Sequence, residues 1–286
     1  MHGPGSPYTL LFDEDDAQGP GLPEAARAIY GGDWRLPAPR AGRPYTFTNF
    51  VVSHDGRISF DEPSRSGGGD VSRNAPHDTW LMALIRARAD AILTGGGTLR
   101  VARRHRWTPW EIFPAEREAL VAMRAAEGRA QLPLLVVVSG SGAIPADAAA
   151  LSVPGQPVLI ATSAAGEPRA RAELAELAHL EYHVSPGPRV DFAALLAHLH
   201  SACGVRTLLS EGGALVYGEL IAAQLIDEVF TTVSPIVIGN RVLPAAPRPS
   251  LVEGIAFSPE RPPLLRLISL RRHGDYLFQR ARFVEE

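Results

Sequence analysis

The sequence contains one cysteine, Cys203, and no lysine among its 28 basic residues. A single cysteine cannot form an internal disulfide or supply a zinc site built from cysteine ligands. Without lysine, the chain has no Schiff-base lysine, no lysine general base and no P-loop lysine. These absences exclude pyridoxal chemistry and Walker-type nucleotide hydrolysis.

Long apolar runs and a strong charge of one sign are also missing. No apolar run approaches the roughly 20 residues that span a membrane. The N-terminus has no basic region followed by an apolar one, so we expect no signal peptide. The net charge of −3 gives no electrostatic footprint for nucleic acid. We therefore expect a cytoplasmic protein that binds a small molecule, with neither nucleic acid nor a membrane as its partner.

The chain divides into an N-terminal extension, residues 1–44, and one predicted domain, residues 45–286. The extension is rich in proline and glycine and carries the acidic run Asp13-Glu14-Asp15-Asp16. We expect it to be partly irregular and to lie on the surface, with Trp34 as a docking contact and the acidic run in solvent. The chain of 286 residues is long enough to bury a full core.

Beyond residue 44, strand-like and helix-like segments alternate. Strands are predicted at residues 46–52, 90–93, 134–138, 158–161, 180–184, 207–209 and 228–233, and helices at 76–89, 99–102, 114–129, 168–178, 191–202 and 214–223. This alternation predicts an α/β fold with a mostly parallel central sheet flanked by helices. Residues 264–270 and 276–283 flank a short turn, which predicts an antiparallel hairpin at the C-terminus.

Two glycine turns each follow a buried strand and precede a helix. They are Thr94-Gly95-Gly96-Gly97-Thr98 and Ser210-Glu211-Gly212-Gly213. Such a turn places unpaired N–H groups at a helix N-terminus, which favours an anion, and glycine lets the backbone approach a ligand closely. Open α/β sheets bind ligands at the carboxyl ends of their strands. One turn is equally well explained by helix–strand packing, whereas the pair indicates nucleotide binding.

Two carboxylates are candidates for the chemistry. Glu211 would repel a phosphate, so we expect it to face the substrate side of the cleft, the alternative being a helix cap. Asp55 is a candidate for orienting substrate or relaying a proton, the alternative being a turn residue that accepts backbone N–H groups. The cluster Arg100, Arg103, Arg104 and Arg106 is either a phosphate clamp or a solvated helix face. The histidines show no metal-ligand spacing, so no metal site is predicted.

Four segments resemble the motifs of the riboflavin-pathway pyrimidine reductases, of the dihydrofolate reductase-like superfamily. They are Asn-Phe-Val-Val-Ser-His-Asp-Gly at residues 49–56, Arg-Ala-Arg-Ala-Asp-Ala-Ile-Leu-Thr-Gly-Gly-Gly-Thr at 86–98, Leu-Ser-Glu-Gly-Gly-Ala-Leu-Val-Tyr-Gly-Glu at 209–219, and Ile-Asp-Glu-Val at 226–229 followed by Ser-Pro-Ile-Val-Ile-Gly at 234–239. Their order and spacing are similar to the reductase domain of bacterial bifunctional deaminase-reductases. The resemblance implies an NADPH-dependent 5-amino-6-(5-phosphoribosylamino)uracil reductase. It also implies hydride transfer to the ribose C1′, and a homodimer.

The resemblance also assigns roles to particular residues. It implies cofactor contacts from Thr94, Gly95, Gly96, Gly97, Thr98, Ser139, Gly212, Gly213, Ala214 and Leu215, with Ser139 near the adenosine 2′-phosphate. It implies substrate contacts from Ser53, Arg86 and Glu211. Together with the reasoning above, this makes Asp55 and Glu211 the predicted catalytic residues.

The chain departs from the family pattern in two ways. With a single cysteine it cannot supply the Cys-x-x-Cys motif of the zinc deaminase domain, so we expect at most a stand-alone reductase. Where family members often carry an acidic residue after the second motif, this chain has Val101-Ala-Arg-Arg-His-Arg-Trp107. Two alternatives therefore stay open: a dihydrofolate reductase-like enzyme for a pteridine or another small heterocyclic imine, or a non-catalytic nucleotide-binding protein.

Overall fold

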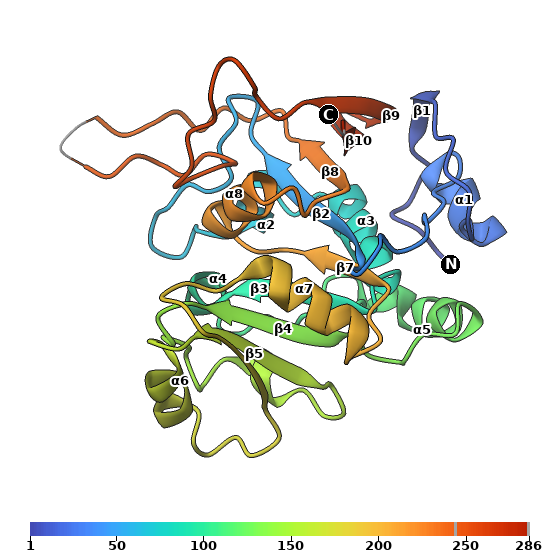
Figure 1. Ribbon diagram of the computed structural model, residues 1–286. Helices are drawn as coiled ribbons and strands as arrows, with labels where there is room; N and C mark the ends of the chain where they lie inside the picture. The colour runs from blue at the N-terminus through green and yellow to red at the C-terminus, as the bar shows by residue number, and fades with distance from the viewer. Residues whose placement is uncertain (243–244, 285–286) are drawn as a thin grey trace.

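The computed structural model describes residues 1–242 and 245–284 of the chain (Figure 1). Residues 243–244 and 285–286, which belong to the predicted domain 45–286, lie outside the described residues. In the part of the chain that is described, no helix is both long and apolar enough to cross a membrane.

Strands and helices alternate along most of the chain. The strands are β1 (Thr9–Asp13), β2 (Tyr45–Val52), β3 (Ala91–Gly95), β4 (Leu134–Ser139), β5 (Val158–Ser163), β6 (Glu181–Ser185), β7 (Thr207–Ser210), β8 (Glu228–Val233), β9 (Leu265–His273) and β10 (Tyr276–Phe283). The α-helices are α1 (Glu24–Tyr30), α2 (Gly68–Ser72), α3 (Pro76–Ala87), α4 (Gly96–Val101), α5 (Arg117–Ala126), α6 (Glu167–Glu173), α7 (Phe192–Ser201) and α8 (Ala214–Ala222). Two 3₁₀ turns, η1 (Pro114–Glu116) and η2 (Ala149–Ser152), complete the set in the described ranges.

All ten strands of the described residues join one sheet, in the order β1-β9-β10-β8-β2-β7-β3-β4-β5-β6. The strands from β8 to β6 pair in parallel. Strand β10 pairs antiparallel with both β8 and β9. The predicted α/β class, the mostly parallel sheet and the C-terminal antiparallel hairpin are therefore confirmed.

The central strands are covered on both faces, as their continuous apolar runs predict. Successive residues of β3 point to opposite sides of the sheet. Ile92 joins a core cluster with the α3 residues Trp80 and Leu84, and Leu93 joins a second cluster with the α7 residue Leu195. Figure 1 shows α7 lying across the sheet near β4. This double cover fixes the carboxyl ends of β3 and β7, where the glycine turns begin.

The N-terminal segment is built into the fold. Strand β1 pairs antiparallel with β9 and forms one edge of the sheet (Figure 1). Trp34 is 0% exposed, and its ring lies 5.5 Å from that of Phe47 and 4.8 Å from that of Phe230, between ring centroids. Trp34 thus provides the docking contact that the sequence predicts, over β2 and β8, and the edge strand β1 is an addition that the sequence did not predict.

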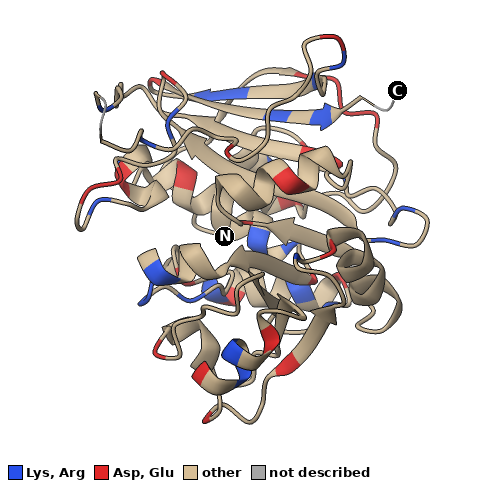
Figure 2. Cartoon of the chain, turned by 60° about the vertical axis from the view of Figure 1, so that its left-hand side comes forward, with Lys and Arg blue, Asp and Glu red and all other residues tan. Residues whose placement is uncertain are grey.

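The acidic run is held by buried arginines of the C-terminal hairpin, whose basic positions are blue at the top of Figure 2. Asp13 lies 2.7 Å from Arg271, and Asp15 lies 2.5 Å from Arg280 and 2.6 Å from Arg282. Arg271 and Arg280 are at most 1% exposed, and a buried charge is costly unless it is paired. The prediction that the run faces solvent is therefore wrong for Asp13 and Asp15.

Candidate active site

The two glycine turns lie side by side at the carboxyl edge of the parallel strands. Leu93 of β3 pairs with Ser210 of β7, and the Glu211 N–H donates to the Leu93 carbonyl at 2.8 Å. The first turn leads directly into α4 and the second into α8. The arrangement that the sequence predicts, two turns at one sheet edge, is thus present in the structure.

Close packing explains why the first turn needs glycine at position 96, whereas a Cβ at Gly213 in the second turn would make only an ordinary contact. A Cβ added to Gly96 would stand 2.8 Å from the Ala143 carbonyl oxygen and 3.3 Å from Ser139 Oγ. A Cβ added to Gly213 would stand 3.5 Å from Thr98 Oγ1. The first turn therefore touches the end of β4, and the Thr98 hydroxyl lies next to the second turn. Four predicted cofactor residues come together in this way.

The remaining predicted cofactor residues differ in accessibility. Leu215 is 62% exposed at the start of α8, whereas Ala214 is 7% exposed and Thr94 is 0% exposed. Thr94 thus lies beneath the first turn. A cavity of about 200 Å³ opens at this edge, lined by Leu215, Glu219 of α8 and the β4 end at Val138. It offers an apolar wall beside the turns.

Arg86 and Glu211 form a buried ion pair. The Arg86 Nε donates to Glu211 Oε1 at 2.7 Å, and Nη2 donates to Oε2 at 2.6 Å. The exposed fractions of the two side chains are 2% and 9%. The resemblance implies that both residues contact substrate. The structure joins them to each other, and Glu211 is the more accessible of the two.

His105 completes this arrangement, and sequence reasoning missed it. Its Nε2 lies 2.9 Å from Arg86 Nη2, and its ring packs edge-on against Trp107 at 4.7 Å. Burial, and then the charge of Arg86, lower the pKa of His105 to about 3. A neutral imidazole therefore accepts the hydrogen bond from the guanidinium. The spacing of His105 ruled out a metal role, and nothing local in the sequence indicated its contact with Arg86.

Asp55 and Ser53 stand apart from this ion pair. Asp55 accepts hydrogen bonds from the Ser53 hydroxyl at 2.6 Å, from Ile238 N–H at 2.9 Å and from Gly239 N–H at 2.7 Å. Burial acts to raise the pKa of Asp55, but these hydrogen bonds lower it to about 2. No hydrogen bond or ion pair within residues 1–242 and 245–284 joins Asp55 to Glu211. The geometry suits the alternative role of Asp55 as a turn residue that accepts N–H groups.

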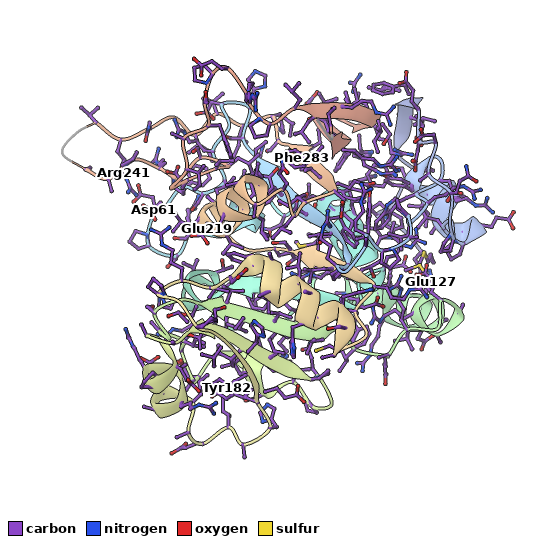
Figure 3. The ribbon with its side chains drawn as sticks, viewed as in Figure 1. Asp61, Glu127, Tyr182, Glu219, Arg241 and Phe283 are labelled. Atoms are coloured by element: carbon purple, nitrogen blue, oxygen red, sulfur yellow. The ribbon has the colours of Figure 1, made fainter. Side chains whose placement is uncertain are left out.

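The loops after β2 and β8 are tied together at a second point. Arg241 Nη1 lies 2.7 Å from Asp61 Oδ2, and Figure 3 shows the two labelled side chains close to each other. Arg241 also contacts Glu62 at 3.3 Å. These contacts and those of Asp55 join the first-motif loop to the fourth-motif loop, so both loops have a fixed position at the carboxyl edge.

The four arginines after the first turn have different surroundings. Arg103 pairs with Asp147 at 2.6 Å, and Arg106 lies 3.9 Å from Glu111. Arg100 is exposed and donates to the Ala143 carbonyl at 3.1 Å. The Ser139 hydroxyl donates to the same carbonyl at 3.2 Å. Arg100 is therefore the arginine of this cluster that lies beside Ser139 and the first turn.

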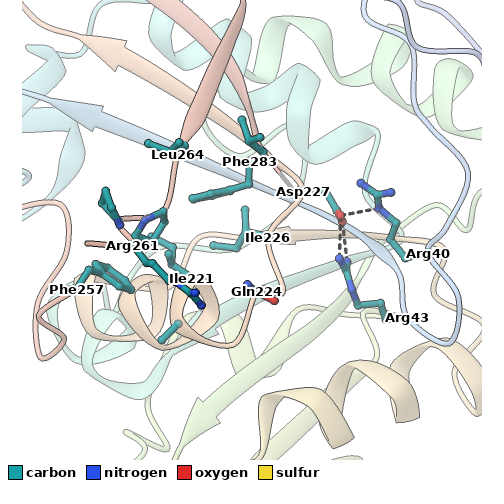
Figure 4. Close-up of a pocket in the computed structure, with 14 residues that line it drawn as sticks. Arg40, Arg43, Ile221, Gln224, Ile226, Asp227, Phe257, Arg261, Leu264 and Phe283 are labelled. Atoms are coloured by element: carbon teal, nitrogen blue, oxygen red, sulfur yellow. Dashed lines mark hydrogen bonds and ion pairs between the residues drawn. The ribbon is translucent and has the colours of Figure 1, made fainter. Parts of the chain in front are cut away.

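A larger cavity, of about 540 Å³, lies at the opposite end of the strands (Figure 4). Its lining includes Asp227, directly before β8, and Arg43, two residues before β2. Arg43 and Arg40 both donate to the Asp227 carboxylate. Since open α/β sheets bind their ligands at the carboxyl ends of the strands, this cavity is a poor candidate for the active site despite its size.

Comparisons with known proteins agree with this geometry. The model of the RibD C-terminal domain family matches residues 44–275. The chain belongs to this family. It is 32% identical over 241 residues to the 2,5-diamino-6-ribosylamino-4(3H)-pyrimidinone 5′-phosphate reductase of Archaeoglobus fulgidus, covering 84% of this chain and 99% of that protein. The protein of the same name from Methanothermobacter thermautotrophicus is 27% identical, covering 70% and 81%.

A solved structure has a similar fold. A pyrimidine reductase-like protein from Corynebacterium diphtheriae superposes with a TM-score of 0.62 at 20% identity, covering 85% of this chain and 93% of that chain. At this identity the likeness shows a shared fold. The predicted family and the predicted fold class are therefore both confirmed.

Proposed function

We propose that this RibD C-terminal domain protein is an NADPH-dependent reductase that acts on a ribosylamino pyrimidine 5′-phosphate of riboflavin biosynthesis. The observation that carries the proposal is the meeting of two glycine turns at the carboxyl ends of the adjacent strands β3 and β7, with Glu211 directly after β7 in the second turn. The names of the relatives from Archaeoglobus fulgidus and Methanothermobacter thermautotrophicus support the same substrate class. The family membership supports the reductase chemistry.

The residues present fit a dinucleotide. A Cβ on Gly213 would make only an ordinary contact with the Thr98 hydroxyl, at 3.5 Å, so Thr98 lies next to the second turn. We assign the phosphates to the first N–H groups of α8 and to Thr98, because a helix N-terminus favours an anion. We assign the adenosine 2′-phosphate to Ser139 and Arg100. Bound NADPH would supply a hydride, and the protein would supply orientation and electrostatics.

Glu211 has the position and charge to act on the substrate. Reduction of an imine carbon is easier when the imine nitrogen carries positive charge. A nearby carboxylate in a partly buried site would stabilise that charge strongly. Arg86 holds both carboxylate oxygens, so the orientation of Glu211 is set before the substrate binds. We therefore propose Glu211 as the catalytic residue. The hydrogen bonds of Asp55 suit a structural role in the neighbouring loops.

Titration and turnover test this function. Purified protein is titrated with NADPH and with NADH, and NADPH oxidation is then followed with a panel of substrates. We expect micromolar NADPH binding and turnover of the ribosylamino pyrimidine phosphate. A preference for dihydrofolate or another pteridine would contradict the proposed substrate. Absence of NADPH binding would contradict the proposed cofactor. Binding without turnover of any substrate would favour a nucleotide-binding role.

We also propose that the protein is a cytoplasmic homodimer. The first strand carries the exposed residues Leu10 and Leu11, and the neighbouring β9 region carries the exposed residues Leu264, Leu265 and Leu267. Apolar side chains gathered at one sheet edge favour a protein contact. The lone Cys203 forms no internal disulfide, which suits a reducing compartment. Light scattering that gives a monomer at assay concentration would contradict the dimer.

A further inference from the structure

The stretch of residues 101–107, where the chain departs from the family pattern, reaches the ion pair of the candidate site. His105 lies in this stretch, and its Nε2 meets Arg86 Nη2 at 2.9 Å. The carbonyl of Thr108, just beyond the stretch, receives a longer bond of 3.4 Å from Arg86 Nη1. The segment for which the sequence left open a phosphate clamp or a solvated helix face thus also contacts the guanidinium that binds Glu211.

The hydrogen bonds of Arg86 to other side chains go to two residues, Glu211 and His105. Nε and Nη2 bind the Glu211 carboxylate, and Nη2 also binds His105. Guanidinium has five N–H donors in a planar fork and accepts none, so His105 must offer an unprotonated nitrogen. The contact therefore requires Nε2 without a hydrogen. A protonated ring would place a second positive charge against Arg86.

We propose that His105 is a positioning residue for the reductase reaction: its unprotonated Nε2 fixes the guanidinium of Arg86, and Arg86 fixes the Glu211 carboxylate that faces the substrate. The inference rests on the proposed function. The guanidinium of Arg86 is the enclosed centre of this chain of contacts, because Arg86 is 2% exposed and Glu211 is 9% exposed. His105, at the other end, is also partly exposed, so Arg86 lies between two more accessible side chains.

A purely stabilising role fits these contacts less well. A buried ion pair adds little stability compared with apolar side chains of the same volume, because both charges lose their water. What such a pair does provide is a fixed orientation of charged groups. The fork of Arg86 binds both oxygens of Glu211 and leaves the carboxylate little freedom to rotate. Orientation of Glu211 is therefore the property that His105 controls.

Three substitutions of His105 separate its role as a hydrogen-bond acceptor from its role in packing. His105→Gln keeps a neutral acceptor, His105→Leu removes it, and His105→Lys adds a positive charge beside Arg86. We expect His105→Leu to lower kcat/KM for the pyrimidine substrate by about 100-fold, since a misplaced catalytic group can cost that much. His105→Lys should lower it further, and His105→Gln should restore most of it. The KM for NADPH should stay unchanged in all three.

His179→Gln is the matched control. The His179 ring makes a hydrogen bond of the same length, 2.9 Å, but to the backbone carbonyl oxygen of Leu151. It lies in the segment between α6 and β6, and we expect wild-type kinetics. If His105→Leu and His105→Gln lose activity, NADPH affinity and thermal stability together, the role is structural and the inference is wrong. If His105→Leu keeps full kcat/KM, the inference is also wrong, while the proposed function stands.

A spectroscopic measurement needs no substrate. The ¹⁵N NMR signals of the His105 ring should show an unprotonated Nε2 from about pH 5 to about pH 8, where an ordinary histidine gains its proton. Removing the partner by Arg86→Leu should shift the His105 signals and leave those of His179 unchanged. A His105 ring that titrates in this range would overturn the inference, whatever the enzyme turns over. Failure of the wild-type protein to reduce the pyrimidine would instead contradict the proposed function.

Discussion

Replacing Trp34 with alanine tests whether the N-terminal segment belongs to the core. The side chain is 0% exposed, and its ring packs edge-on against Phe47 and Phe230. Arg88 adds a guanidinium 4.8 Å from the ring centroid. Truncating a buried tryptophan costs about 3–5 kcal/mol through lost burial and an empty cavity. Because whole domains are stable by about 5–15 kcal/mol, we expect a large loss of stability.

The size of the loss should depend on what replaces the ring. Trp34 Nε1 finds no hydrogen-bond acceptor among the described residues, so the indole brings a buried donor without a partner. Trp34→Phe keeps most of the ring and removes that donor, and should therefore cost clearly less than Trp34→Ala.

Urea unfolding followed by circular dichroism measures both changes. Arg35→Ala is the control, because its side chain is 47% exposed and its ion pair with Asp33 is 3.4 Å long. It should change the free energy of unfolding by about 0.5 kcal/mol or less. If Trp34→Ala loses less than about 1 kcal/mol, the N-terminal segment is not part of the core, since a fully buried tryptophan would then contribute like a surface residue.

Three further predictions concern charged groups. Burial acts to raise the pKa of Asp15, but Arg280 lowers it to about 2, so the stability it contributes is present above the unfolded-state pKa and is lost as the pH falls toward 2. Asp15→Asn should cost about 3 kcal/mol near neutral pH and flatten the acid limb of an unfolding curve. Asp55→Ala should lower Tm by loosening the loops and leave the pH profile of kcat unchanged, whereas a lost acid limb would point to proton transfer. Arg100→Gln should raise the KM for NADPH about tenfold and leave that for NADH unchanged, with Arg104→Gln as the control.

The sequence predicted the central strands well because their signals are local. Residues 134–138 form one apolar run, and β4 spans Leu134–Ser139. Strand β1 was missed because the run Thr9–Asp13 is short and lies among glycines and prolines, and its partner β9 is more than 250 residues away. The segment predicted as one helix at 114–129 is divided into the 3₁₀ turn η1, which begins at Pro114, and the helix α5, which ends at Ala126.

The parts of the candidate site that depend on the order of strands, glycines and helices could be predicted from the sequence. The parts that depend on pairs of side chains could be predicted less well. Strand, glycine and helix in succession placed both turns at the carboxyl edge. The partner of Arg86 was not visible, because Glu211 is 125 positions away and each residue alone suits a substrate contact. The prediction that the acidic run faces solvent was wrong for the same reason. Its partners on β9 and β10 are long-range, so the charges of Asp13 and Asp15 looked free.

Glu211, held by Arg86 beside two glycine turns, is the residue that we propose to act on the substrate of an NADPH-dependent reductase. The most direct test compares wild type with Glu211→Gln in the oxidation of NADPH by the ribosylamino pyrimidine phosphate. We predict turnover by the wild type and a fall in kcat of about 100-fold in the variant, with NADPH affinity unchanged. A variant that reduces the substrate at the wild-type rate would contradict this role of Glu211.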